Sequence, residues 1–533
     1  MRLAFFAAAL AGLLTATGCS SATPPSASTP GAGDQPQPGG RVSLRWAADP
    51  SDWDITRGGY CNTCTPAIAL AYSSLLGQDE QLKLMPELAQ SWDLSPDATA
   101  FTFHLRSGLK FANLPPVNGR DLTATDVKFS YEYLTRTGEF AGRKDLPAYV
   151  YVWMFEGMDS VAASDPSTVT VRFKKPFAPF LSYAASADNA IMAREIYDAD
   201  GSFSNQMVGS GPFQLDVPGR QRGSRLVFKK NPTYFEPGKP YLDELQYLII
   251  SDPSTMIAAF QTKQLDILDA RSSESAASIV RGVPQAQSSE DLAPSPSHMY
   301  MNTRTGPLSD VRVRRAISLG LNRDEFLQVL FQGKGGWALA GAFQDTYTQA
   351  EVKQILKYDP EAAKKLLAEA GYASGLDLEL NYAQDGNPDT YLTEAQLLQA
   401  QMKKVGINLT FKITDRPTYL ERRRKGEFVI NTTGKAVQGD VDSYLYAVFY
   451  STSSANYGGV KDPALDKLID AQRQEPAPAK RQELVRQAVR LIADQAWQLA
   501  LYTPPVFTYW QPHVRDYVSG ADDFRLLSTW IKK

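Results

Sequence analysis

The sequence predicts a mixed α/β fold with two or three lobes, for three reasons. Segments with the two-residue alternation of strands and segments with the helical spacing of apolar residues follow one another from residue 41 to residue 533. A chain of 533 residues with 43% hydrophobic content is larger than one compact domain of about 150 residues. Residues 20–40 are rich in Pro, Gly and Ser and almost free of apolar side chains, so the folded body should begin near Arg41.

The amino terminus predicts export. Residues 3–14 form an apolar stretch behind Arg2, too short for a bilayer span of about 20 residues but long enough for a signal peptide. Small residues lead into Cys19, which resembles the lipobox of bacterial lipoproteins, with Ala16 where leucine is usual. This resemblance implies a signal peptide at 1–18 and a lipid on Cys19. The alternatives are a plain secretory cleavage with a spare thiol, or an uncleaved anchor.

Residues 19–40 then form a flexible tether, because their composition cannot bury enough surface to offset chain entropy. No later run approaches the length of a membrane span. We therefore expect a soluble body held outside the cytoplasmic membrane by lipidated Cys19.

The two remaining cysteines, Cys61 and Cys64, stand close together in CNTC. In an exported protein this spacing favours a disulfide across one turn. A redox pair would need a strand-helix context that is not evident here, and a zinc site would lack two ligands. We expect the disulfide to stiffen the loop that carries it.

The usual signatures of enzymes are missing from the sequence. No serine has glycine at both −2 and +2, there is no HExxH, and GKGG at 333–336 lacks the spacing of a P-loop. Asp440 and Asp442 could serve a glycosidase, but their separation across a cleft is unknown. A net charge of −3 indicates no nucleic-acid footprint. We predict a protein that is not an enzyme, with no cofactor, no metal site and no nucleic-acid partner. The three histidines are expected to be structural or solvated: His104, His298 and His513.

Several elements can be assigned locally. Thr123-x-x-Asp126 ahead of an apolar-periodic run is typical of a helix capping box. The remaining assignments are a strand from Arg41, a helix over 65–76, two strands joined by a Ser-Gly turn within 98–111, a helix over 359–372 capped by Gly371, and a strand over 376–383.

Segments spread over nearly the whole mature chain resemble family 5 solute-binding proteins of ABC transporters, the oligopeptide- and dipeptide-binding group. They occur in the family's order: PELAQSWDLSPDATAFTFHLRSGLKF (86–111), LTATDVKFSYEYLTR (122–136), KPFAPFL (175–181), GSGPF (209–213), MIAAFQTKQLDIL (256–268), MNTRTGPLSDVRVRRAISLGLNRDEFL (301–327), YDPEAAKKLLAEAGY (358–372) and QAQMKKVGINLTF (399–411). One such segment would be weak evidence for the family, whereas the whole series in this order is specific to it.

The resemblance implies a periplasmic-binding-protein-like type II fold: two α/β lobes joined by a hinge that the chain crosses twice, plus an extra α/β lobe. By analogy, lobe I is discontinuous and comprises 41–75, 190–296 and 506–533. Residues 76–189 would form the extra lobe II, and 297–505 the opposing lobe III. Ligand would be enclosed between lobes I and III, because a ligand that contacts both lobes favours the closed state.

The resemblance also implies a function. The chain would be a monomeric, lipid-anchored protein of the cell surface or periplasm that delivers a ligand to the permease subunits and ATPases of an ABC importer. Peptides are the first ligand class, and oligosaccharides, metal chelates and other small metabolites are alternatives. Two further classes are a secreted hydrolase on an unrelated scaffold and a binding lipoprotein used in signalling or as a chaperone.

One departure from the family concerns the peptide amine. In peptide binders of the family an aspartate at the end of a Trp-x-x-Asp stretch pairs with the α-amine, and alignment places Gly434 and Val437 at those two positions. The usual anchor is therefore missing. Asp440 or Asp442 could replace it, or they could simply form a turn or helix cap.

Other candidate ligand contacts follow from location within the family. In the loop after the first strand, Trp53 and Tyr60 could stack on ligand and Arg57 could bind a carboxylate. The alternative is a buried tryptophan and a surface arginine. Tyr382 and Gln384 end a strand that, by the same analogy, faces the other lobe.

Overall fold

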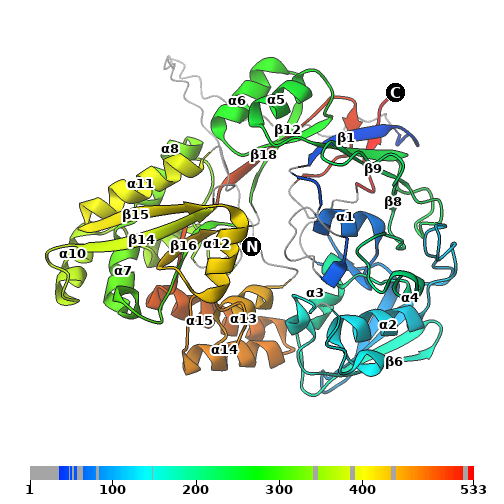
Figure 1. The fold of residues 1–533 in the computed structure, drawn as a ribbon, viewed down its shortest axis with the longest axis horizontal. Coiled ribbons are helices and arrows are strands. Elements are labelled where there is room, and N and C mark those ends of the chain that lie inside the picture. The colour runs from blue at the N-terminus through cyan, green and yellow to red at the C-terminus, as the bar shows by residue number, and fades with distance from the viewer. Residues whose placement is uncertain are drawn as a thin grey trace, which may run out of the picture. The chain divides into compact units, whose positions relative to one another are not determined.

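A seven-stranded mixed sheet contains the first strand of the folded body. The computed structural model describes residues 35–46, 48–50, 53–56, 64–79, 83–146, 148–293, 295–339, 346–383, 390–433, 440–519 and 526–533. β1 (Arg41–Trp46) pairs in parallel with β10 (Glu244–Ile249) and β11 (Ile267–Ala270), so segments far apart in the sequence lie side by side (Figure 1). The order is β12-β18-β11-β1-β10-β9-β8. The other four strands are β8 (Phe213–Leu215), β9 (Arg225–Lys230), β12 (Gln287–Leu292) and β18 (Pro505–Trp510).

The second large sheet has five strands in the order β15-β14-β16-β13-β17. Parallel pairing joins β14 to both β15 and β16, whereas β13 is antiparallel to β16 and β17. β14 confirms the strand predicted over 376–383. The strands are β13 (Ser297–Met301), β14 (Leu376–Ala383), β15 (Ile407–Thr414), β16 (Ile430–Thr433) and β17 (Gln498–Tyr502).

The chain passes between these two sheets twice, from β12 into β13 and from β17 into β18. The two passages are bonded together, because Ala293 N–H donates to the Pro504 carbonyl at 2.9 Å. Gly336 and Thr503 exchange backbone hydrogen bonds of 3.0 and 2.7 Å. A Cβ on the preceding Gly335 would lie 2.6 Å from the Thr503 carbonyl oxygen, so this close approach requires glycine. This confirms the two-crossing connection expected of the fold class.

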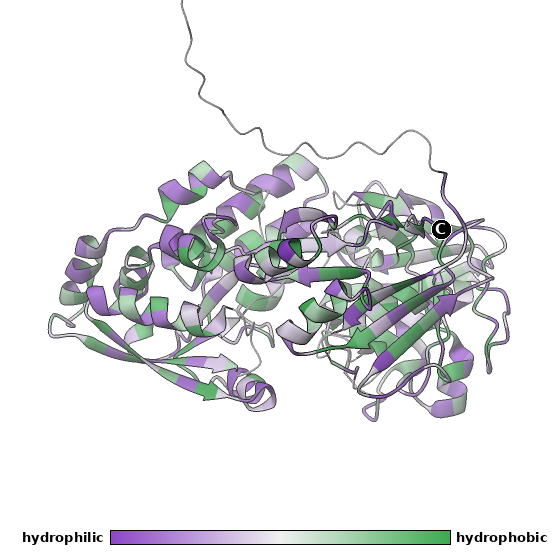
Figure 2. Ribbon diagram, turned by 90° about the horizontal axis from the view of Figure 1, so that it is seen from above, coloured by the Kyte–Doolittle hydropathy of each residue, from purple (hydrophilic) through white to green (hydrophobic). Residues whose placement is uncertain are grey.

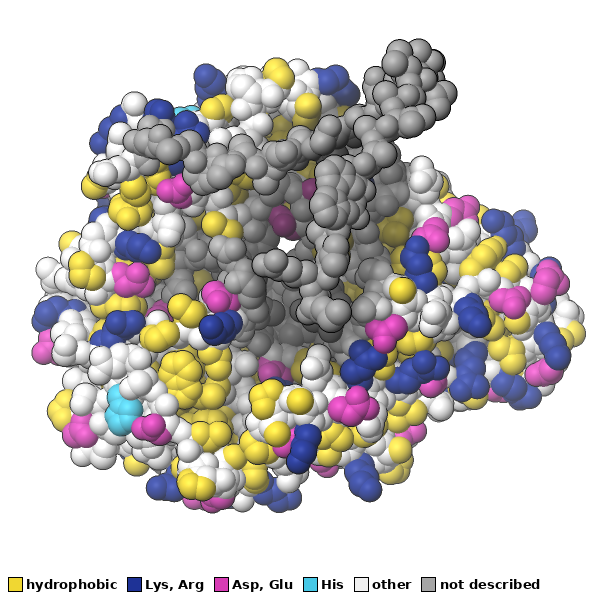
Figure 3. Space-filling model, turned by 180° about the vertical axis from the view of Figure 1, so that it is seen from behind, with side chains coloured by type: hydrophobic (Ala, Val, Ile, Leu, Met, Phe, Trp, Pro, Cys, Tyr) yellow, Lys and Arg dark blue, Asp and Glu magenta, His cyan; other side chains and the backbone are white. Residues whose placement is uncertain are grey.

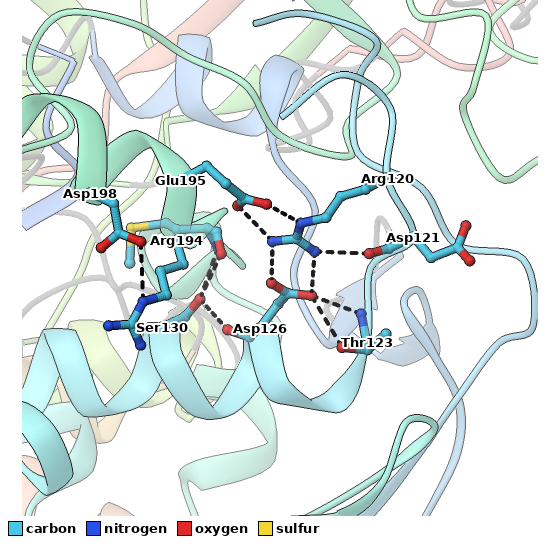
Figure 4. A network of polar contacts seen from close by, with 9 residues as sticks. Arg120, Asp121, Thr123, Asp126, Ser130, Arg194, Glu195 and Asp198 are labelled. Carbon is cyan, nitrogen blue, oxygen red and sulfur yellow. Dashed lines mark hydrogen bonds and ion pairs between the residues drawn. The ribbon is translucent and has the colours of Figure 1, made fainter. Parts of the chain in front are cut away.

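A four-stranded antiparallel sheet, in the order β4-β5-β7-β6, is covered by α2 (Ala124–Thr135). The predicted capping box is confirmed, since the Thr123 N–H donates to the Asp126 carboxylate at 2.9 Å. Arg120 lies between Asp126 and Glu195, and its Nη2 is 2.7 Å from an oxygen of each (Figure 4). It thereby ties the start of α2 to α4 (Arg194–Asp200). The strands are β4 (Ala89–Leu94), β5 (Ala100–Leu105), β6 (Met158–Asp165) and β7 (Thr168–Phe173).

Two local predictions are corrected in part. The helix predicted over 65–76 is present as α1 (Cys64–Ala71), but it ends at Ala71 rather than at residue 76, because the Ala71 carbonyl accepts the Gly211 N–H at 3.0 Å. The second strand expected within 98–111 is reduced to an isolated bridge between Lys110 and Asp121, where the backbone pairs with a nearby loop. Tertiary contacts decide both outcomes.

Most helices around the five-stranded sheet begin at a residue whose side chain accepts a backbone N–H of the first turn. The helix predicted over 359–372 is α10, with Gly371 at φ +93° just beyond its end. α8 and α15 contact β17, α11 contacts β15, and α12 contacts β14. The capped helices are α7 (Val311–Leu319) at Asp310, α8 (Arg323–Phe331) at Asn322, α9 (Gln349–Ile355) at Thr348, α10 (Pro360–Glu369) at Asp359, α12 (Arg416–Lys425) at Asp415 and α14 (Pro463–Gln474) at Asp462. The others there are α11 (Tyr391–Lys404), α13 (Asp442–Phe449) and α15 (Pro478–Gln495).

Three hydrophobic clusters hold residues 37–533 together as one compact unit. The first joins the seven- and four-stranded sheets, and the second lies around the five-stranded sheet. The third packs α5 (Pro253–Gln261) and α6 (Ser273–Gly282) on β11 and β18. Apolar and polar residues alternate along many of these elements (Figure 2). Trp153 packs against both of the first two clusters. Within the described ranges, no helix has the length and apolar character needed to cross a membrane.

The remaining elements are short. They are the strands β2 (Leu76–Gln78), β3 (Leu84–Pro86), β19 (Val514–Arg515) and β20 (Trp530–Ile531), the helix α3 (Phe180–Ala184), and the 3-10 turns Gly138–Phe140, Val152–Phe155, Ala187–Asn189 and Pro307–Ser309.

Candidate functional site

Two parallel strands of the five-stranded sheet end side by side at one edge. The register pairs Asn381 of β14 with Asn431 of β16, so the ends of these strands at Ala383 and Thr433 are neighbours. In α/β sheets, ligands commonly bind beyond the carboxyl ends of parallel strands. The segments that leave this edge, 384–389 and 434–439, contain Gln384, Gly434 and Val437, which lie outside the described residues. Their roles stay predictions.

On the other large sheet, the loop after β1 is described only in part. Trp53 is 5% exposed, and the Arg220 guanidinium covers its ring at 4.9 Å. In this arrangement Trp53 is packed against Arg220, and its contact with ligand stays a prediction. Arg57 and Tyr60 lie outside the described residues. The next described neighbour, Thr56, accepts the Val150 N–H at 3.3 Å, which ties this loop to residues near 150.

Cys64 opens α1, is buried, and forms a disulfide. Its predicted partner, Cys61, and the predicted lipidation site, Cys19, lie outside the described residues. The Cys61 to Cys64 pairing therefore stays a prediction.

Tyr382 points into the core beside its strand and is 4% exposed. Its hydroxyl donates to Glu394 at 2.9 Å, and its ring meets that of Tyr391 edge-on with centroids 4.7 Å apart. Glu394 also accepts the Ser297 hydroxyl at 2.8 Å and the Tyr502 hydroxyl. Burial raises the pKa of Glu394, and the three hydroxyl donors oppose the rise. In this arrangement Tyr382 supports the sheet, and its contact with ligand stays a prediction.

Asp440 and Asp442 are both paired with arginines. Arg481 donates to the two oxygens of Asp440 at 2.8 and 2.5 Å. Asp442 is fully buried, with Arg473 Nε at 3.1 Å. The Asp442 N–H donates to Asp440 at 2.8 Å, so Asp440 forms a turn immediately ahead of α13, whose cap position is Val441. An amine would have to compete with these guanidinium groups for either carboxylate.

Burial raises the pKa of Asp442, and the charge of Arg473 opposes that rise. The Tyr183 hydroxyl and Gln472 Nε2 also donate to Asp442, at 2.8 and 2.5 Å. The carboxylate is therefore held by donors from two parts of the chain, since Tyr183 belongs to α3 and the others to α14.

Arg473 is a residue that the sequence patterns did not indicate. Its guanidinium contacts the Glu156 carboxylate, donates to the Trp153 carbonyl at 3.0 Å, and lies 4.8 Å from the Phe177 ring. Burial alone would lower the pKa of Arg473, but the neighbouring carboxylates hold it above its ordinary range. No local motif could have revealed this residue, because its partners on Glu156 and Trp153 are distant in sequence.

Charged side chains of both signs are interspersed over the described part of the face drawn in Figure 3. Among the described residues, no group of three or more His, Cys, Asp or Glu side chains is placed to hold a metal ion.

Comparison with known proteins decides the family. Residues 83–456 match the model of bacterial extracellular solute-binding proteins, family 5. The chain belongs to this family. As a family 5 member it is a solute-binding protein that works outside the cytoplasm.

Among relatives of this family 5 protein, the dipeptide-binding protein of Escherichia coli K12 is 29% identical over 462 residues, covering 82% of this chain and 84% of the relative. Heme-binding protein A of Haemophilus influenzae is 26% identical over 460 residues, covering 82% and 83%. The two relatives are thus named for different ligands at similar identity.

Solved structures share the fold. The Helicobacter pylori periplasmic binding protein DppA, in complex with the peptide STSA, superposes with a TM-score of 0.81 at 24% identity, covering 93% of this chain and 99% of that one. AgaA from A.tumefacien R10, in complex with agropinic acid, gives a TM-score of 0.79 at 23% identity, covering 93% of this chain and 99% of that one. The predicted two-lobed type II fold is confirmed.

Proposed function

We propose that this family 5 protein binds a peptide between lobes I and III and delivers it to the permease subunits of an ABC importer. The observation that carries the proposal is the double passage between two sheets, with β14 and β16 presenting adjacent carboxyl ends. The names of the Escherichia coli and Helicobacter pylori relatives support a peptide as the solute. The lobe boundaries given above are part of this proposal.

The peptide would be held without the family's usual aspartate. Gly434 and Val437 occupy the aligned Trp and Asp positions, and the two nearby candidates for replacement are paired with arginines. A buried charge requires a partner. If the peptide amine took the place of Arg473 or Arg481 at its carboxylate, that arginine would be left buried without a partner. We therefore expect the backbone and side chains of the peptide, rather than its α-amine, to determine affinity.

The remaining candidate contacts belong to the proposal as well. Arg57 would bind a carboxylate, Tyr60 and Trp53 would offer apolar surface, and Tyr382 and Gln384 would stand on the opposing lobe. The protein would act as a monomer, held to the membrane by a lipid on Cys19 through the tether 19–40.

A thermal-shift screen tests the solute class. The protein is denatured and refolded to remove carried-over ligand, then mixed with di- to penta-peptides, their N-acetylated forms, oligosaccharides, metal chelates and heme. A ligand at 100 times its dissociation constant stabilises the native state by about 2.7 kcal/mol, a shift of several degrees. We expect free and N-acetylated peptides to raise the melting temperature equally.

Two other outcomes would correct this proposal. If only free peptides raise the melting temperature, an amine anchor exists and the alignment at Val437 is misplaced. If peptides fail while sugars, chelates or heme succeed, the solute belongs to another class.

The anchor is tested separately by Cys19→Ala. We expect this variant to leave the membrane fraction, and continued membrane association would contradict lipidation.

A further inference from the structure

Residues 153–183 and 440–481 are joined directly by contacts away from the double passage. Figure 1 draws β12 and β18, which carry the two passages, at the top of the view, and α3, α13 and α14 at the bottom. By the proposed boundaries, the first segment lies in lobe II and the second in lobe III. Lobe III is therefore connected covalently to lobe I through the double passage, and by non-covalent contacts to lobe II on the other side.

Three kinds of interaction make up this joint. Tyr183 donates its hydroxyl to Asp442 at 2.8 Å, and the Arg473 guanidinium reaches the Glu156 carboxylate and the Trp153 carbonyl. The Ala178 N–H donates to the Arg473 carbonyl at 2.7 Å.

Aromatic rings complete the contact around Arg473. The ring of Phe177 lies on one side of the guanidinium at 4.8 Å, and the ring of Tyr446 lies 3.9 Å from it. These two rings come from the two segments, so a single arginine is held by both.

Two charged groups of the joint, Asp442 and Arg473, are almost completely removed from water, whereas the Glu156 side chain is 47% exposed. The side chains of Asp442 and Arg473 are 0% and 7% exposed. A buried ion pair is stable only while its partners and hydrogen bonds remain, because an isolated buried charge is costly. Tyr183 is fully buried too, and the hydrogen bond from its hydroxyl to Asp442 exists only while the two segments are in contact. Separation of the two segments would therefore require these groups to be hydrated together.

We propose that Tyr183, Asp442 and Arg473 form a latch that closes the side of the molecule opposite the double passage. Solute enters when the latch is apart and is retained when it is complete. The role of the latch in retaining solute rests on the proposed function. The latch itself is a property of the chain without solute.

A latch of this kind sets affinity without touching the solute. The apparent dissociation constant equals the intrinsic value divided by the fraction of molecules in the retaining state. Loss of one hydrogen bond to a charged acceptor lowers the latched-to-open ratio by about tenfold or more. Tyr183 and Arg473 are thus positioning residues for binding.

The test measures the distance across the joint in the chain without solute. Spin labels are placed on Lys175→Cys and Lys467→Cys, two exposed positions on either side, in the Cys19→Ala chain. We expect Tyr183→Phe to move a large part of the distance distribution to longer values. Arg473→Met should do so more strongly.

A matched control distinguishes the loss of the latch from the general effect of removing a buried tyrosine hydroxyl. Tyr149 is 4% exposed, and its hydroxyl donates to the Asp188 carbonyl and to Asn189 Oδ1 at 2.9 and 2.8 Å, within the same proposed lobe. Tyr149→Phe should leave the distance distribution unchanged. If Tyr183→Phe and Arg473→Met also leave it unchanged, the latch does not exist.

A second arm uses tri-alanine as the probe. With a functioning latch, Tyr183→Phe should raise its dissociation rate about tenfold, whereas Tyr149→Phe should not. An unchanged rate in Tyr183→Phe would overturn the role in retention. If tri-alanine fails to bind the parent chain, the peptide proposal is weakened, and the label distances still decide whether the latch is present.

Discussion

Asp442 and Glu394 are two buried carboxylates with different partners. Asp442 faces Arg473 and also accepts hydrogen bonds from Tyr183 and Gln472. Glu394 accepts hydrogen bonds from three hydroxyl groups, and no ion pair to it is present among the described residues. Both carboxyls have raised pKa values because of burial.

The comparison shows how location determines the kind of partner. Glu394 bonds Ser297 and Tyr502, which stand at the start of β13 and the end of β17, immediately beside the two passages. There the chain is covalently continuous, and neutral donors suffice to hold the strands. Asp442 lies where two segments meet without a covalent link, and its partner Arg473 also contacts the Glu156 carboxylate of the other segment, which adds attraction between the two segments.

The largest expected effect is that of Arg473→Met, which leaves Asp442 buried without a cation. We expect the free energy of unfolding to fall by about 3–5 kcal/mol, measured by urea denaturation. The control is Arg490→Met, which breaks an ion pair to Asp494 whose side chains are 51% and 43% exposed. That variant should lose about 1 kcal/mol or less. Equal losses of unfolding free energy in the two variants would show that burial does not make the Arg473 ion pair more costly to break than the exposed Arg490 ion pair.

A smaller effect is expected from removing one hydroxyl beside each carboxylate. Tyr502→Phe and Tyr183→Phe each delete a donor, and a hydrogen bond to a charged group contributes about 1.5–3 kcal/mol. We expect the larger loss of unfolding free energy in Tyr502→Phe at pH 8, because Asp442 keeps Arg473 whereas Glu394 has only hydroxyl partners. The reverse order would mean that Arg473 does not compensate Asp442.

The smallest expected effect is that of Glu394→Gln, which should change the slope of the unfolding free energy against pH. Between the ordinary value of 4.5 and the raised pKa of Glu394, the folded carboxyl keeps a proton that the unfolded one releases. The native state then binds more protons than the unfolded state. The contribution of Glu394 to the free energy of unfolding is therefore greatest below pH 4.5 and falls as pH rises through that window. Urea denaturation from pH 4 to pH 8 should show a flatter profile of unfolding free energy against pH in Glu394→Gln than in the parent chain. Identical slopes would show that Glu394 ionises normally.

Local patterns predicted the elements that depend only on neighbouring residues. The alternation from Arg41, the capping box at Thr123 and the turn at Gly371 all appear where expected. The helix over 65–76 ended early because Ala71 bonds to Gly211, a residue far away in the sequence. Such a partner leaves no trace in the periodicity of the segment itself.

The candidate site was predictable only in outline. The strand ends at Ala383 and Thr433 do lie side by side, as a ligand site at a sheet edge requires. Asp440 and Asp442 were identified from their place in the chain, but their pairing with Arg481 and Arg473 could not be, since each arginine lies in a segment without a motif.

The sequence by itself determined the fold class and the family, because hydrophobic periodicity and ordered motifs are properties of contiguous residues. The tertiary structure decided which charges are buried together. Desolvation and pairing depend on distances between segments such as those of Tyr183, Asp442 and Arg473, and only folding sets those distances.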